Sequence, residues 1–301
     1  MSSKWIDKSW RNVLSENLDD AISFFMPDIA ADRDYGKAPF LLPPELSAIG
    51  GDSDKGMRTV DLAISIPMTT GPDQRLALHI EQQHAHDRDF PWRMFQGHYR
   101  MSDQYRIPVT SLAIFTGNIS PVSTYLNTCY GTRVQFDFNF YHVQSVDVKE
   151  LENDPRIFAV VILAAKRMLD AGGSPQKRGQ YSLELLDLLA ERGYDNKKAR
   201  SLQRFVYRIL QIKNSEIDAK VREVWNMQLI PIDEAVKEIY VRDALEEGME
   251  RGMERGKKIG REEGQEEKAL QVARSMLDDG FSTEAIQKHT GLARESILAL
   301  S

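Results

Sequence analysis

Two stretches, RTVDLAISI at residues 58–66 and LALHIEQQ at residues 76–83, decide the fold of this chain. In both, aliphatic residues alternate with small or polar ones, which is typical of a half-buried β-strand. A polar segment with Gly71 and Pro72 separates them, so we expect an antiparallel hairpin. Alternation places one set of side chains on a common aliphatic face: Val60, Leu62, Ile64, Ile66, Leu76, Leu78, Ile80 and Gln82.

The opposite face of this hairpin carries Asp61 from the first strand and His79, Glu81 and Gln83 from the second. Two neighbouring carboxylates repel each other, and a divalent cation relieves that repulsion. Mg²⁺ prefers hard oxygen ligands, takes one or two protein carboxylates and keeps several waters. We therefore predict a Mg²⁺ site at Asp61 and Glu81, with the backbone carbonyl of Gln82 as a further ligand. The solvated face of an amphipathic hairpin would explain the same residues equally well.

The segments around the hairpin predict an α/β fold. Apolar residues at helical spacing indicate a first helix before the hairpin, and a long loop rich in Gly, Pro and Asp follows that helix. A second helix and two β-rich segments come after the hairpin. The predicted bounds are Trp10–Phe25 for the first helix, 28–57 for the loop, 91–106 for the second helix, and 109–116 and 134–148 for the β-segments.

Three regions follow from these patterns: an α/β domain at 1–150, a helical region at 151–247, and a glycine-repeat helix with a terminal helix pair at 248–301. The helical region is either separate or a tightly packed extension of the first domain. Its candidate helices lie at 154–170, 181–191, 196–212, 215–226 and 232–247.

Glycine recurs at every fourth position in the charged stretch that opens the last region, at Gly248, Gly252, Gly256, Gly260 and Gly264. Each glycine inside a helix costs about 1 kcal/mol relative to alanine, so five cost roughly 5 kcal/mol. Close approach of another helix would compensate, and we therefore expect self-association or docking there. A flexible charged linker explains the same composition.

Composition sets broad limits on function. The chain has 301 residues, 42% of them hydrophobic, and a formal charge of −6, so any contact with phosphate must be local. Cys129 is the single cysteine, which excludes an intramolecular disulfide and a multi-cysteine zinc site. The polar start MSSKWIDKSWRN is unlike a signal peptide, and no apolar run is long enough for a membrane span. We expect a cytoplasmic protein without membrane contact.

The order of Asp61, a turn and Glu81-x-Gln83 resembles the PD-(D/E)XK nuclease fold. More narrowly, the chain is similar to the Rpn family of recombination-promoting nucleases and transposases over roughly residues 5–120 and again at the C-terminal tail. The stretches that carry this similarity are ENLDDAISFFMPDIA (16–30), LALHIEQQ (76–83) and FPWRMFQGHYRMSDQYRIPVTSLAIFTG (90–117).

The resemblance implies a restriction-endonuclease-like core with a magnesium-dependent DNA endonuclease activity. Asp61 and Glu81 would be the metal ligands, and Gln83 would stand where the wider superfamily has lysine. Glutamine orients a water or phosphate but brings no positive charge. The superfamily often takes a further acid from the first helix; Glu16 is the candidate, in competition with Asp19 and Asp20.

Several other residues are candidates for DNA contact. Arg93, Gln96 and Arg100 share one helical face, which would meet a DNA backbone or simply be solvated. His79 would contact phosphate or a water in the outer shell of the metal, or it would pack as a neutral histidine. The tail GFSTEAIQKHTGLARESILAL predicts a helix from Ser282 to Gly291 and a short one after it, a compact helix-turn-helix that resembles the Rpn tail. Such a pair of helices would insert one into a DNA groove or act as a small helical interaction module, and Lys288, His289 and Arg294 are the first candidates for DNA contact.

Three functions remain open from the sequence. The preferred one is a DNA endonuclease with Mg²⁺ as its cofactor. The second is a catalytically inactive relative that binds DNA or protein, with a homo-oligomer formed through the C-terminal helical region. The third is a nuclease that acts on RNA.

Overall fold

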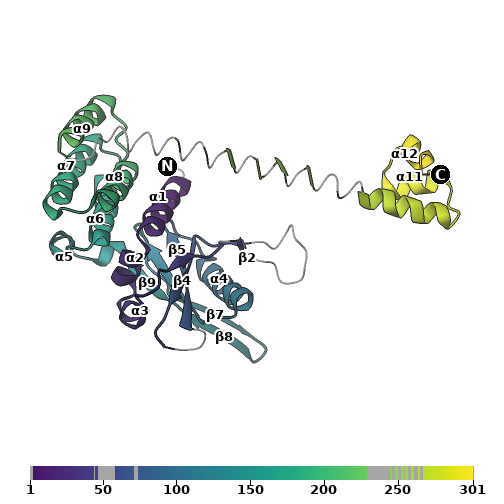
Figure 1. Ribbon diagram of the computed structural model, residues 1–301, viewed down its shortest axis with the longest axis horizontal. Coiled ribbons are helices and arrows are strands. Elements are labelled where there is room, and N and C mark those ends of the chain that lie inside the picture. Colours follow the sequence, from purple (N-terminus) through teal and green to yellow (C-terminus); the bar gives the residue numbers. More distant parts are fainter. Residues whose placement is uncertain are drawn as a thin grey trace. The chain divides into compact units, whose positions relative to one another are not determined.

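The computed structural model describes residues 3–43, 45–46, 58–70, 74–228 and 267–300, together with single positions between 241 and 264. The chain divides into two compact units, Met1–Val236 and Lys237–Ser301, which are described one after the other (Figure 1). Among the described residues, no helix has the length and apolar content needed to cross a membrane.

The first unit is built on a mixed five-stranded sheet with strand order β1-β4-β5-β6-β9. Strand β4 is antiparallel to both β1 and β5, while β6 is parallel to β5 and β9. Leu62 lies opposite Ile80, so the predicted hairpin is confirmed, and with it the α/β class. The strand bounds are β1 Phe40–Leu41, β4 Leu62–Pro67, β5 Arg75–Gln83, β6 Val109–Phe115 and β9 Asn139–His142.

Helix α4 (Phe90–Tyr105) connects the parallel strands β5 and β6, as predicted for residues 91–106. Its Met94 and Met101 pack against small residues of the sheet, whereas the aliphatic strand residues face the other way, onto α1, α2 and α6. Figure 1 shows helices on both sides of the sheet. The face that carries Glu81 is therefore covered by protein, and the prediction of a solvated hairpin face is wrong.

One residue of the predicted aliphatic face lies on the other side. Val60 packs with Ala63, Ala77 and Met101 beneath α4. Val60 and Asp61 belong to neither β3 (Arg58–Thr59) nor β4, so the two-residue alternation does not continue across them. Strand β3 instead pairs with β2 (Glu45–Leu46) in a separate two-stranded sheet.

The predicted first helix is two helices, α1 (Ser3–Glu16) and α2 (Leu18–Phe25), followed by α3 (Pro27–Asp32). The break falls at Asn17, whose φ of −135° is not helical. Its buried side chain donates to the carbonyl of Val13 and to the hydroxyl of Ser201, both at 2.9 Å. An asparagine that bonds the backbone in this way competes with the helix ladder.

Beyond the sheet, five helices extend the same core. The helix α6 (Ile157–Ala171) is buried nearly all round, and its apolar residues join one cluster with Trp10, Ile22 and the sheet. These helices therefore belong to the same hydrophobic cluster as the sheet and do not form a core of their own. The others are α5 Val148–Asn153, α7 Pro175–Arg192, α8 Asn196–Leu210 and α9 Ser215–Gln228. The helix predicted at 232–247 lies almost wholly outside the described residues.

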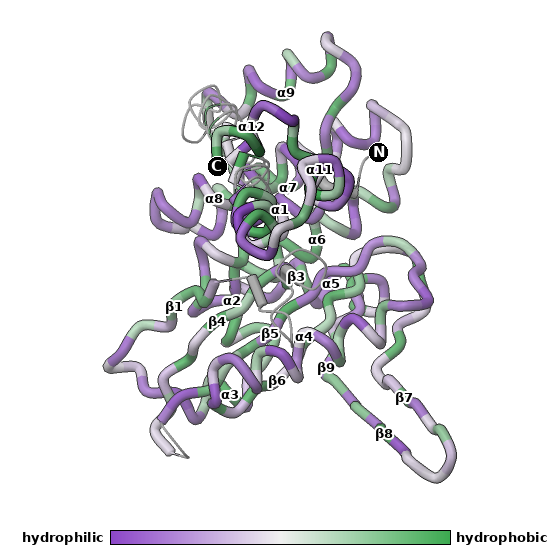
Figure 2. The backbone as a smooth tube through the Cα atoms, turned by 90° about the vertical axis from the view of Figure 1, so that its right-hand side faces the viewer, coloured by the Kyte–Doolittle hydropathy of each residue, from purple (hydrophilic) through white to green (hydrophobic). Residues whose placement is uncertain are grey.

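The β-segment predicted at 134–148 is divided. Strand β8 (Thr132–Asp137) ends before Phe138, β9 starts at Asn139 and a short 3₁₀ turn follows at Val143–Ser145. Strand β8 pairs with β7 (Thr124–Cys129), which the sequence reasoning missed. Figure 2 shows the β7–β8 hairpin projecting from the body of the first unit.

In the second unit, a helix through residues 267–278 packs with α11 (Thr283–Thr290) and α12 (Arg294–Leu298) around Ala273, Ile286 and Ile297. The side chain of Ser282 accepts from the N–H of Ala285, and Gly291 ends α11 at a φ of 71°. These are the predicted start and stop of the helix. The five repeated glycines are also helical, and none of the residues that the structure describes has a heavy atom within 4 Å of the position that a Cβ would take.

Candidate functional site

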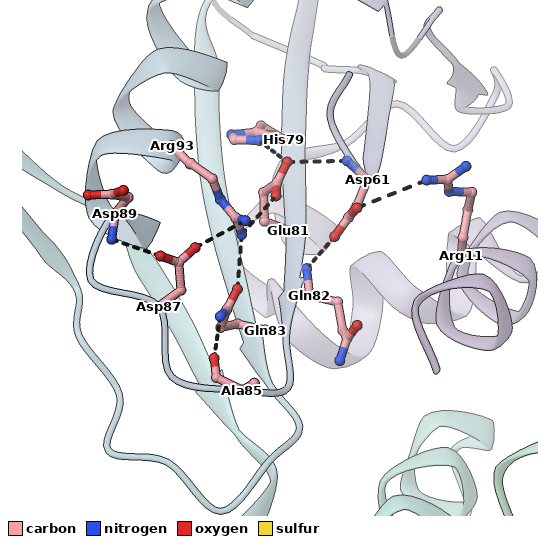
Figure 3. A network of polar contacts seen from close by, with 10 residues as sticks. All are labelled: Arg11, Asp61, His79, Glu81, Gln82, Gln83, Ala85, Asp87, Asp89 and Arg93. Atoms are coloured by element: carbon pink, nitrogen blue, oxygen red, sulfur yellow. Dashed lines mark hydrogen bonds and ion pairs between the residues drawn. The ribbon is translucent and has the colours of Figure 1, made fainter. Parts of the chain in front are cut away.

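The two predicted carboxylates lie side by side at the start of β4 and near the end of β5. Glu81 Oε1 accepts from the N–H of Asp61 at 3.2 Å, and Asp61 Oδ2 accepts from the N–H of Gln82 at 2.8 Å (Figure 3). Each carboxylate thus bonds the backbone of the neighbouring strand. Glu81 is buried, while the side chain of Asp61 remains about one third exposed at 32%. The pair therefore has one sheltered and one accessible member.

The two acids differ in pKa. Burial and the neighbouring Glu81 carboxylate raise the pKa of Asp61 to about 6, against the hydrogen bond from Gln82 and the charge of Arg11. Burial alone would also raise the pKa of Glu81, but the His79 hydrogen bond and charge, with Arg93, hold it below the usual value. Two acids whose environments shift their pKa values in opposite directions form a candidate functional site.

His79 is completely buried beneath α4, so the prediction that it contacts DNA phosphate is wrong. Its Nε2 lies 3.4 Å from Glu81 Oε1 and its Nδ1 lies 3.2 Å from Ser111 Oγ. A Cβ on Gly97 of α4 would come within 2.4 Å of this imidazole ring. The absence of a side chain at Gly97 therefore leaves room for the His79 ring, and the contact between His79 Nε2 and Glu81 Oε1 fixes the orientation of Glu81.

Gln83 and Arg93 form one unit beside the acid pair. Arg93 donates to Gln83 Oε1 at 2.9 Å, and Gln83 Nε2 donates to the carbonyl of Ala85. The same guanidinium lies 3.2 Å from Asp87 and 3.9 Å from Glu81. Arg93 therefore faces the acid pair and brings there the positive charge that Gln83 lacks.

The acid of the first helix that lies near this pair is Asp7, which the sequence reasoning missed because it began the helix at Trp10. Asp7 contributes to the raised pKa of Asp61. Burial raises the pKa of Asp7 itself, and the charges of His84, Arg11 and Arg93 act against that rise. The four-residue spacing of Asp7 and Arg11 on an amphipathic helix is the signal that could have found them.

Glu16 lies elsewhere, so its prediction as a catalytic acid is wrong. Its Oε2 accepts from Ser201 at 2.6 Å and from Arg204 at 2.7 Å, which ties α1 to α8. The competing acids are engaged as well: Asp19 binds Arg33 and Asp20 binds Lys198. All three acids serve the packing of helices.

The remaining predicted residues do not join the acid pair. Arg100 lies two turns beyond Arg93 on α4, where it donates to Tyr99 Oη at 3.4 Å. Lys288, His289 and Arg294 are exposed in the second unit. They stay predictions for DNA contact.

Asp61 and Glu81 are the candidate ligands for Mg²⁺. Within the described residues, no group of three or more His, Cys, Asp or Glu side chains lies close enough together to ligate one ion. Asp61 and Glu81 nevertheless suit Mg²⁺, which takes one or two carboxylates and completes its shell with water. Their mutual repulsion, expressed in the raised pKa of Asp61, is what a bound cation would relieve.

Fold and site together define a mixed α/β protein with a C-terminal helical region and an acid pair, of which Glu81 is buried on β5 and Asp61 is partly exposed just before β4. Residues 266–301 match the family model of the Rpn/YhgA-like nuclease family, C-terminal HTH domain. The match supports the predicted relation to the Rpn family through the tail. No curated protein and no solved structure matches the chain.

Proposed function

We propose that this protein is a magnesium-dependent DNA endonuclease of the recombination-promoting nuclease and transposase type, which hydrolyses phosphodiester bonds. The observation that carries the proposal is the Asp61–Glu81 pair, two carboxylates held together in a largely buried position with opposite pKa shifts. Removing a carboxylate from water costs free energy. Two carboxylates held close together in a largely buried position are therefore typical of a functional site.

The order of elements supports a PD-(D/E)XK core. Helix α1 precedes the antiparallel strands β1, β4 and β5, after which α4 leads to the parallel strand β6. The acids stand on β5 and immediately before β4, as the resemblance implies. The family model that residues 266–301 match belongs to a nuclease family, which supports the nuclease class and concerns the tail alone.

Each residue then has a role. Asp61 and Glu81 would hold Mg²⁺, with the Gln82 carbonyl as a further ligand. The ion would supply charge neutralisation at the phosphate and an activated water. His79 keeps Glu81 in its orientation, and Arg93 stabilises negative charge beside it. Gln83 positions Arg93 through its amide oxygen.

DNA is the proposed substrate because the tail matches a helix-turn-helix domain. In such domains the second helix of the motif enters the major groove. Exposed Lys288 and Arg294 lie on α11 and at the start of α12. We propose that these two cations contact the DNA backbone.

The test is plasmid cleavage with and without Mg²⁺. Wild-type protein should nick or linearise plasmid, and Asp61→Asn and Glu81→Gln should each lower the rate about 1000-fold. This factor corresponds to about 4 kcal/mol of lost metal-assisted stabilisation. Asp103→Asn and Glu216→Gln are matched controls, since both acids are exposed and distant in sequence from the pair. Unchanged cleavage in Asp61→Asn and Glu81→Gln would refute the site.

A second function, a catalytically inactive DNA-binding or protein-interaction protein, is favoured by Gln83. Both ends of its amide have protein partners, Arg93 and Ala85, so it is poorly placed to orient a water. Calorimetric titration with Mg²⁺ distinguishes the two functions. Binding that disappears in Glu81→Gln supports the endonuclease, and absence of binding to the wild type supports the inactive relative.

A further inference from the structure

The β7–β8 hairpin lies outside the five-stranded sheet and has no role in the site described above. Its base is fixed to α4 by aromatic rings: Tyr125 stacks on Phe95 at 5.2 Å and contacts Trp92 at 5.2 Å. Phe136 of β8 packs against Phe95 at 5.7 Å and His98 at 4.7 Å. The rest of the hairpin extends beyond this anchor (Figure 2). An isolated two-stranded hairpin is only marginally stable in water. We therefore expect the projecting part of this hairpin to have a function.

The tip of this hairpin and its outer face, which carries Leu126 and Gln135, are exposed. Tyr130 is fully exposed at the tip with a φ of 44°, and Gly131 follows with a φ of 84°. Tight hairpin turns with two positive φ values favour Asn or Gly, so an exposed tyrosine there is strained without any gain in packing. Leu126 is 55% exposed on the outer face, in register with Gln135. Arg133 lies two residues nearer the tip, opposite Thr128, and its guanidinium donates to Gln135 Oε1 at 3.0 Å.

The charge of the hairpin differs from that of the whole chain. Charged residues make up 28% of the sequence, yet Arg133 is the only one from Asn118 to Phe136. Asp137, the first acid after this run, lies at the base, where Thr124 and Gln135 donate to it. Asp137 is the one acid of the ribbon and shares its outer face with Arg133 and Gln135, but it lies at the base, so the part nearer the tip can approach a phosphate backbone without a facing carboxylate.

The hairpin is also continuous with the acid pair through α4. Trp92 contacts Tyr125 of β7, and the next residue, Arg93, binds Gln83 and lies 3.9 Å from Glu81. The first turn of α4 therefore links the base of the hairpin directly to the place where a phosphodiester would be cleaved.

We propose that the β7–β8 hairpin is the arm with which the first unit holds duplex DNA, its outer face lying in a groove beside the scissile phosphate. A two-stranded β-ribbon fits the major groove, where Arg and Gln side chains recognise base edges. Arg133 and Gln135 stand in alternate positions of β8 on this outer face, and Tyr130 at the tip contacts the sugar-phosphate wall. The inference rests on the proposed function, because it takes the substrate to be DNA.

Cys129 makes this arm directly testable. It is the only cysteine in the chain, it is exposed, and it immediately precedes Tyr130. An iron–EDTA reagent attached to Cys129 of the full-length Asp61→Asn protein should cut an end-labelled linear duplex at a few positions. The control protein carries Cys129→Ser and Glu216→Cys, which moves the reagent to exposed α9. Because the reagent acts only near its attachment point, scission from Cys129 shows that bound DNA lies beside the hairpin.

Affinity gives a second measurement on the same background. Tyr130→Asn keeps a residue that tolerates positive φ, and Arg133→Gln keeps the strand register. Together they should weaken duplex binding about 10-fold, the loss expected for one groove contact. Met227→Ala, which removes an exposed apolar side chain on α9, should leave affinity unchanged.

The outcomes separate the two proposals. Scission from Cys129 together with weaker binding supports the arm even if wild-type protein never cleaves plasmid, which would remove the endonuclease alone. Cleavage by the wild type without scission from Cys129 and without loss of affinity overturns the arm and leaves the endonuclease standing. A reagent at Cys129 that modifies a second copy of the chain, and no DNA, also overturns it.

Discussion

The two faces of the central sheet differ in what they bury. One face packs Leu62, Ile64, Leu78 and Ile80 against α1, α2 and α6, as in an ordinary core. The other face buries Ser65, His79, Glu81 and Ser111 beneath α4. Apolar burial stabilises a fold, whereas buried polar and charged groups are maintained only with partners and at a cost. In β4 and β5, therefore, one face stabilises the fold through apolar burial, and the opposite face carries the residues of the proposed site.

The aliphatic face should show the largest stability effect. Ile64 is fully buried in the main cluster, so Ile64→Ala should lower the free energy of unfolding by about 3 kcal/mol through lost burial and a residual cavity. Urea denaturation of the full-length chain measures this loss. Ile64→Val should cost only about 1 kcal/mol. If plasmid cleavage at low temperature fell as steeply as stability in both variants, the proposed division between the faces would be wrong.

The sequence predicted much of this division because alternation depends on local spacing. It placed Glu81, His79 and Gln83 on one face, and it paired β4 with β5. It failed where long-range packing decides. No local pattern shows that α4 would cover the polar face, and Val60 changed sides because the strand is interrupted at Asp61. Glu16 was misplaced for a similar reason, since its partner Arg204 lies 188 residues later in the chain.

On the polar face, Gly97→Ala should lower both the stability of the fold and the rate of cleavage. The new methyl group would meet the His79 ring at 2.4 Å, and neither the buried ring nor the helix can yield freely. We expect a loss of about 2 kcal/mol in unfolding free energy, typical of overpacking. Cleavage should fall as well, because a displaced His79 no longer orients Glu81. The imidazole NMR resonances of His79 report the displacement, and unaltered resonances with full stability would contradict the close packing.

The acid pair should make stability depend on pH. The folded-state pKa of Asp61 is about 6, above the unfolded value of 3.8, so its proton stabilises the fold fully below pH 3.8. That contribution disappears as pH rises through 6. In EDTA, Asp61→Asn should therefore be more stable than wild type by about 1 kcal/mol at pH 8, after allowance for partial exposure, and no more stable at pH 3.5. Thermal unfolding at the two pH values measures this, and addition of Mg²⁺ should reverse the order at pH 8.

The smallest effect is expected at a glycine that faces open space. Gly248 is helical, and within the described part of the chain nothing lies within 4 Å of the position its Cβ would occupy. Gly248→Ala should therefore stabilise the helix by about 1 kcal/mol, the opposite sign to Gly97→Ala. Circular dichroism at 222 nm during thermal unfolding measures this gain. If Gly248→Ala instead lowered both helicity and the mass found by sedimentation, the glycine stripe would be in contact with a second copy, as the predicted self-association requires. A gain in helicity without a change in mass would show that the stripe is free in solution.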